Sequence, residues 1–246
     1  MGVSRLAEHR TALRALPAEA WPDYLARHSG LPGPRANLEL AAAVAEEAPG
    51  DRLYAYARSS EEYTALCGAV GLGRLAAGGD PGAVRELRRL APDPRWRVRE
   101  GVAMGLQRLG DADPAALRRI AGAWAKDQHP LVRRAAVAGL CEPRLLGDAR
   151  TARRAVELLD AVTAGLADLP AAVRRDPGVR TLRQALGYCW SVAVAALPGP
   201  GFDCLERWAD SDDPDVRWLV RENLRKSRLG RADPDRSAGL RTRLGD

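Results

Sequence analysis

The chain has 246 residues, of which 46% are hydrophobic, so it is long enough to bury a sizeable core. Aromatic residues make up only 5%, while helix-forming Ala, Leu, Arg and Glu dominate, and this composition favours an all-α protein. The net charge of +6 indicates a polyanionic partner, although Lys126 and Lys226 are the only lysines among the 38 basic residues, and such an arginine excess is also typical of a GC-rich genome.

The sequence shows no C-x-x-C pair, no apolar leader and no apolar run long enough to span a membrane. The four cysteines are scattered without a C-x-x-C pair, which favours buried thiols in a reducing compartment. Residues 1–16 have no apolar leader, and the longest apolar run, Trp190–Leu197, is too short to span a bilayer. We therefore expect a cytoplasmic, monomeric protein that makes no membrane contact.

The N-terminal region, residues 1–60, predicts amphipathic helices interrupted at Leu31–Pro34 and Pro49–Gly50. Such helices can cover the first apolar face of a repeat array, so we expect a cap here. The next stretch, Glu61–Leu75, is a degenerate repeat copy. The glycines in Gly71–Gly73 lie inside its helical pattern and follow no strand, so we interpret them as small residues at a helix contact rather than as a phosphate-binding loop.

Four copies of one phrase then follow, each with Asp, usually Pro, then Val and Arg, and further small or apolar residues. Their valines, Val98, Val132, Val179 and Val216, are separated by 34, 47 and 37 residues. Asp suits the start of a helix, Pro is tolerated in its first turn, and the apolar residues that follow share one helical face. A helical pattern precedes each phrase, so this period predicts an array of helix pairs.

The phrase resembles the HEAT repeat over roughly residues 60–228. The resemblance implies an all-α fold, a right-handed α-solenoid of HEAT-like helical repeats in one continuous domain. The expected parts are the N-terminal helical cap at 1–60, the repeats at 61–228 and a flexible basic tail at 229–246.

In a HEAT-type array the second helix of each pair lines the concave surface. Positions opposite the buried stripe of these helices should therefore face a groove. They are aromatic, arginine or acidic residues: Trp96, Glu100, Arg134, Tyr188, Trp218, Arg221 and Arg225. Exposed tryptophan is uncommon unless it contacts a partner. The alternatives are that Trp96 and Trp218 pack under loops and that Glu100 is an ordinary surface carboxylate.

Two stretches carry a closer resemblance. Trp96 and Glu100 are four residues apart and so share one helical face, and the stretch Gln184–Tyr188 supplies a second aromatic residue. This pattern resembles the bacterial alkylpurine DNA glycosylases of the AlkD/AlkC kind, whose groove carries an aromatic residue, a carboxylate four residues later and a second aromatic residue. Here Glu stands where the AlkD type has Asp, and Tyr where it has Trp.

The resemblance implies a DNA glycosylase that excises cationic alkylated purines from double-stranded DNA. Glu100 would be catalytic and stabilise an oxocarbenium-like sugar. The implied contacts to base and sugar come from Trp96, Tyr188 and Trp218, and those to phosphates from Arg134, Arg221 and Arg225.

No metal or organic cofactor is expected, because the histidines are isolated and no metal-binding spacing occurs. The alternative function is a non-catalytic HEAT-repeat scaffold that binds another protein.

Overall fold

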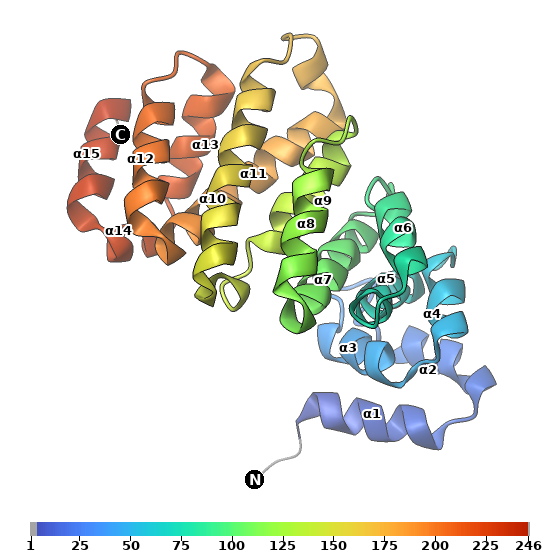
Figure 1. Cartoon of the computed structure of the whole chain (residues 1–246). Helices are drawn as coiled ribbons and strands as arrows, with labels where there is room; N and C mark the ends of the chain where they lie inside the picture. The colour runs from blue at the N-terminus through green and yellow to red at the C-terminus, as the bar shows by residue number, and fades with distance from the viewer. Residues whose placement is uncertain (1–3, 246) are drawn as a thin grey trace. The chain divides into compact units, whose positions relative to one another are not determined.

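The computed structural model describes residues 4–245, and within this range the chain is all-α, with no strand (Figure 1). The predicted fold class of stacked helix pairs is thereby confirmed. The chain divides into two compact units between Asp113 and Pro114, which we describe separately as unit 1 and unit 2. The sequence predicts instead one continuous domain in which the helical cap ends and the repeats begin near residue 60.

Unit 1 contains seven α-helices within its described residues. They are α1 (Arg5–Ala15), α2 (Trp21–His28), α3 (Leu38–Glu47), α4 (Gly50–Ala57), α5 (Glu62–Ala77), α6 (Pro81–Leu90) and α7 (Trp96–Ala112). The central helix is α5, which packs against α3, α4, α6 and α7, while α1 packs on α3. Residues 4–60 thus form helices where the sequence predicted a helical cap, and residues 1–3 of that cap lie outside the described residues.

Glycines bring α5 and α7 into backbone contact. A Cβ atom added to Gly73 would lie 2.1 Å from the carbonyl oxygen of Gly105, and one added to Gly71 would lie 2.2 Å from Leu53 Cδ2 on α4. Glycine is therefore required at Gly73, where backbone atoms lie opposite, whereas at Gly71 the Leu53 side chain would have to shift. This geometry agrees with the interpretation of Gly71–Gly73 as small residues at a helix contact.

Unit 2 contains eight α-helices within its described residues. They are α8 (Pro114–Trp124), α9 (Pro130–Leu140), α10 (Ala149–Ala167), α11 (Pro177–Ala196), α12 (Pro198–Ala209), α13 (Pro214–Leu224), α14 (Ser227–Ala232) and α15 (Pro234–Leu244). The first helices of successive pairs, α8, α10 and α12, lie side by side, and the second helices, α9, α11 and α13, form a layer behind them (Figure 1).

The repeated phrase starts the second helices in two different ways. Asp176 and Asp213 are N-caps, and their Oδ1 atoms accept hydrogen bonds from Val179 and Val216 N–H at 3.0 and 3.1 Å. In the first two copies the Asp lies two residues further from the Val, so Arg95 and His129 occupy the N-cap positions instead. The valine of each of the four copies is buried, and its position marks the inward face of the helix.

The C-terminal segment differs from the predicted flexible tail. Residues 227–244 form α14 and α15, which pack against α11, α12 and α13. Leu229, Leu240 and Leu244 are buried, and Asp233 caps α15 by accepting a hydrogen bond from Arg236 N–H. An Asp-Pro start and leucines spaced four residues apart made this helix detectable from the sequence. Asp246, the last residue of the predicted tail, lies outside the described residues.

Candidate functional site

In unit 1, Trp96 is the first residue of α7, and half of its side chain is exposed (50%). Asp93 fixes the chain before the helix, because its Oδ1 accepts a hydrogen bond from Arg95 N–H at 2.8 Å. Glu100 lies one turn further along α7, is partly buried, and has an interaction of its own with the chain. The aromatic residue and the carboxylate thus occupy adjacent turns of one helix.

A guanidinium covers one part of the Trp96 ring. The Cζ atom of Arg97 lies 4.5 Å from the ring centroid, within the range of a cation–π interaction. Arg97 is itself held in place, since its Nη1 donates to Glu62 Oε2 at 3.0 Å and its Nη2 donates to the Gly33 carbonyl oxygen at 3.0 Å. Trp96 therefore presents an exposed ring on a fixed cationic support.

In unit 2, Tyr188 lies in the middle of α11 and is also close to half exposed (46%). Its hydroxyl accepts a hydrogen bond from Arg228 Nη2 at 3.0 Å, and Arg228 Cζ lies 4.9 Å from the ring centroid. Trp96 and Tyr188 are thus both exposed aromatic residues that carry an arginine, and each lies on the second helix of a pair.

Trp218 on α13 is more enclosed than these two residues. It is partly buried, and its ring lies against Gly187, where an added Cβ would be 3.1 Å from Cζ3 and Cη2 of the indole. Arg183 lies over the ring at 4.1 Å and forms an ion pair with Asp215. The indole is therefore packed against α11, on Gly187 and under the guanidinium of Arg183, whereas the alternative weighed for this residue was packing under a loop.

Asn223 is a residue that the sequence analysis missed. It is fully buried on α13, where its Nδ2 donates to the carbonyl oxygens of Leu186 and Leu219 at 2.9 and 2.7 Å. Its Oδ1 accepts a hydrogen bond from Ser191 N–H at 2.7 Å. These bonds hold the segment of α11 that carries Tyr188. The signal was present in the sequence, because Asn223 interrupts the apolar stripe seven residues after Val216.

The three arginines predicted to bind phosphates all lie in unit 2, on α9 and at α13. Arg221 Nη2 donates to the carbonyl oxygen of Leu244 at 2.6 Å, at the end of α15. Arg225 is exposed and pairs with Glu222. Arg134 is partly buried and has an interaction with the chain. Each of them already has a protein partner, so a phosphate would have to compete with these contacts or share the guanidinium with them.

The seven predicted site residues divide between the two units. Unit 1 carries Trp96 and Glu100, and unit 2 carries the remaining five. Within unit 2, α11 and α13 pack against each other, and this contact brings the Tyr188 turn next to Trp218. The supporting arginines Arg97 and Arg228 were not predicted, and only their position next to a predicted aromatic residue or within the basic C-terminal segment could have suggested them.

Metal-binding clusters and membrane-spanning helices are both lacking in the described part of the chain. Residues 4–245 contain no group of three or more His, Cys, Asp or Glu side chains that could hold a metal ion. No helix in the same range is both long and apolar enough to cross a membrane.

Three comparisons relate the chain to known proteins, and one of them, a match to a family of repeats, bears on its architecture. No curated protein matches the chain. Among solved structures, it is similar to two engineered proteins from the Northeast Structural Genomics Consortium, with 15% and 14% identity, each at a TM-score of 0.35. The alignments cover 94% of this chain and 98% or 100% of the other. A family description, HEAT repeats, matches residues 51–141, so this part of the chain is similar to HEAT-repeat proteins.

Proposed function

We propose that this chain is a DNA-binding HEAT-like repeat protein. The observation that carries the proposal is the pair of exposed aromatic residues, Trp96 and Tyr188, each with a guanidinium stacked or hydrogen-bonded at its ring. An exposed ring offers a stacking surface to a base, and the adjacent arginine stabilises the ring and its stack. The net charge of +6 favours association with a polyanion.

The finer proposal is base excision. An N3- or N7-alkylated purine is a cation, so a π face such as that of Trp96 attracts it. In the excision step the bond between C1′ and the base nitrogen breaks, its electron pair leaves with the base, and water adds to C1′ and releases a proton to the solvent. Glu100, one turn from Trp96, would stabilise the positive charge that develops on the sugar. This role comes from the resemblance of Trp96–Glu100 to the alkylpurine glycosylases.

A second function, a scaffold for a protein partner, is favoured by a different observation. HEAT repeats suit protein interaction, and the arginines around Trp218 are paired with acids, Arg183 with Asp215 and Arg225 with Glu222. This pairing lowers the local positive charge that a DNA backbone would need. A protein partner would instead use the half-exposed aromatic rings as anchors.

Salt dependence of binding separates the two functions. A labelled duplex, plain or methylated, would be titrated with the full chain and followed by fluorescence anisotropy. A protein that makes three phosphate contacts loses roughly 40-fold in affinity between about 50 and 200 mM salt. A steep loss of this kind is expected for DNA binding, whereas no binding to either duplex at low salt would overturn the DNA proposal and leave the scaffold.

Variants then test the carrying observation. Trp96→Ala and Tyr188→Ala should each weaken DNA binding about tenfold or more, since stacking on an aromatic side chain contributes about 1–3 kcal/mol per base. Leu38→Ala is the matched control, because Leu38 is an equally exposed apolar residue of unit 1 (48%) that lies outside the predicted site. Equal losses in all three variants would argue against specific stacking.

The excision step has its own assay. Release of methylated base from DNA would be measured for the unaltered chain, for Glu100→Gln and for the control Glu39→Gln, an exposed carboxylate on α3. Loss of release in Glu100→Gln alone supports the catalytic role. Equal rates in the unaltered chain and Glu100→Gln would remove Glu100 from the mechanism while leaving DNA binding in place.

A further inference from the structure

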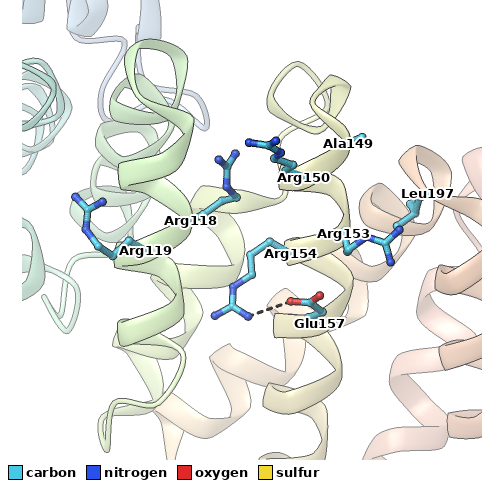
Figure 2. Close-up of a pocket in the computed structure, with 8 residues that line it drawn as sticks. All are labelled: Arg118, Arg119, Ala149, Arg150, Arg153, Arg154, Glu157 and Leu197. Carbon is cyan, nitrogen blue, oxygen red and sulfur yellow. Dashed lines mark hydrogen bonds and ion pairs between the residues drawn. The ribbon is translucent and has the colours of Figure 1, made fainter.

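Unit 2 contains an arginine-lined pocket between the first helices α8 and α10, apart from the predicted site residues (Figure 2). Its volume is about 500 Å³, which lies within the range of small-molecule sites. The lining residues are Arg118, Arg119, Ala149, Arg150, Arg153, Arg154, Glu157 and Leu197. Five arginines therefore stand against one glutamate, which is an unusual charge imbalance for an open pocket.

Two of these arginines are held in place by the chain. Arg118 Nη1 donates to Asp148 Oδ2 and to Thr151 Oγ1, both at 2.8 Å. Arg154 Nη1 donates to Glu157 Oε2 at 3.1 Å. A guanidinium has five N–H donors, so each side chain is oriented by its partner and keeps further donors for a ligand. Figure 2 shows the Arg154 side chain reaching from α10 towards α8.

The other arginines lack such partners. Within the part of the chain that the structure describes, no hydrogen bond or ion pair joins the side chain of Arg150 or Arg153 to another residue, and both residues are exposed. In Figure 2, Arg150 points towards Arg118, whereas Arg153 points towards Leu197. Arg150 therefore adds a charge without an acidic partner to Arg118 and Arg154, which are paired with Asp148 and Glu157, and we call these three residues the arginine trio.

A glycine on α8 makes room for one member of the trio. A Cβ atom added to Gly122 would lie 2.6 Å from Arg154 Nη2, so the guanidinium rests directly over the backbone of α8. Glycine in the interior of a helix is unfavourable by about 0.5–1 kcal/mol relative to alanine. Gly122 is buried within α8. The less favourable glycine thus stands at the position where its missing side chain leaves room for the Arg154 guanidinium.

We propose that the arginine trio binds a compact polyphosphate group, meaning two or three linked phosphates of a small molecule. Guanidinium groups match phosphate oxygens with paired, charge-assisted hydrogen bonds. The three guanidiniums are spread along the pocket, with those of Arg118 and Arg150 near each other and that of Arg154 apart from them (Figure 2). The pocket is large enough for a linked chain of phosphates, which could reach from one end of this row to the other. The site is independent of the proposed DNA-binding function.

The test is calorimetric titration of the full chain with inorganic tripolyphosphate, pyrophosphate and orthophosphate at low salt. Affinity should increase with the number of phosphates. The double variant Arg150→Gln/Arg154→Gln should lose at least about tenfold in tripolyphosphate affinity, because hydrogen bonds to charged groups contribute about 1.5–3 kcal/mol each. The matched control is Arg180→Gln/Arg231→Gln, which removes the same charge from exposed positions of α11 and α14 and should change the affinity less than twofold.

Gly122→Ala separates a shaped site from a diffuse positive surface, because it keeps every charge but displaces Arg154. The variant should remain folded and bind tripolyphosphate several-fold more weakly. Equal losses in the trio variant and in the Arg180/Arg231 control would overturn the proposal. So would displacement of tripolyphosphate by duplex DNA in proportion to the phosphate concentration, since the pocket would then be part of a nucleic-acid surface.

Discussion

Trp96 in unit 1 and Tyr188 in unit 2 are almost equally exposed, but the two units hold them by different means. Trp96 starts α7, which contacts α5 through glycines, and its ring is supported by an ion pair that reaches to α5, that between Arg97 and Glu62. Tyr188 lies in the middle of α11, whose contact with α13 contains a buried amide, that of Asn223. The contact between α5 and α7 is thus a close approach of glycines, whereas the contact between α11 and α13 contains a buried, hydrogen-bonded amide.

The difference shows that helices with the same repeated phrase can be held against their neighbours in two ways, by a close glycine contact or by a buried hydrogen-bonded side chain. In both units the buried stripe decides which face of the second helix turns inward. What then fixes the exposed aromatic residue depends on residues outside the repeated phrase, such as Gly73 on α5 and Asn223 on α13. If this account is right, each contact should respond to a different substitution, and the effects should differ in size.

The largest effect is expected for Gly73→Ala in unit 1. The new Cβ would lie 2.1 Å from the carbonyl oxygen of Gly105, and a backbone atom cannot move away as a side chain can. The helices α5 and α7 would have to separate, which should lower the free energy of unfolding by about 3 kcal/mol or more. Urea denaturation followed by circular dichroism measures this loss.

The control for this substitution is Gly50→Ala on α4, where the added Cβ would be 3.6 Å from Leu75 Cδ2, an ordinary contact. Its effect should stay within about 1 kcal/mol. Similar losses at both positions would mean that the close approach of α5 and α7 is not what makes Gly73 necessary.

In unit 2 the corresponding substitution is Asn223→Ala. It removes three buried hydrogen bonds and leaves Ser191 N–H and the Leu186 carbonyl without this partner. We expect a loss of about 2–3 kcal/mol, since each buried polar group left unsatisfied costs about 1–3 kcal/mol. Gln184→Ala, an exposed polar residue on α11, should change the stability by less than about 0.5 kcal/mol.

These two contacts also show which features of the structure could be predicted from the sequence and which could not. The buried valines and the helix-pair period predicted the fold, because the spacing of apolar residues is a local property that can be read from the chain. The exposure expected of Trp96 and Tyr188 followed from the same helical wheel. The partners of Arg221 and Arg225 did not, since Leu244 is far along the chain and the choice between a phosphate and Glu222 depends on side-chain packing.

The C-terminal segment illustrates a different reason for failure. Its arginines made it look like a solvated tail, yet Arg236 pairs with Glu206 and Asp203, and Leu240 is buried. A high charge content describes a segment's composition, whereas its order depends on whether those charges find partners. The arginine pocket between α8 and α10 was missed for the converse reason, because arginines of two separate helices lie next to each other only in the folded state.

A smaller effect is expected when the support of Trp96 is removed. Arg97→Ala deletes the ion pair with Glu62, the hydrogen bond to the Gly33 carbonyl and the contact with the indole. Because the Arg97 side chain is mostly buried, we expect a loss of about 1–2 kcal/mol. Arg35→Ala, an exposed arginine of unit 1, is the control and should leave the unfolding midpoint unchanged.

The smallest effect concerns the glycine under Trp218. Alanine at an open helical position raises stability by about 0.5–1 kcal/mol relative to glycine, and Gly239 on α15 is such a position, with no atom within 4 Å of an added Cβ. At Gly187 the added Cβ would be 3.1 Å from the indole, whose ring also lies against the guanidinium of Arg183 at 4.1 Å.

Gly239→Ala should therefore stabilise the chain, whereas the gain should be cancelled or reversed in Gly187→Ala. Thermal unfolding of the two variants side by side measures the difference. An equal gain at both positions would mean that the Trp218 ring moves freely, and the tight packing of α11 against α13 would then rest on Asn223 alone.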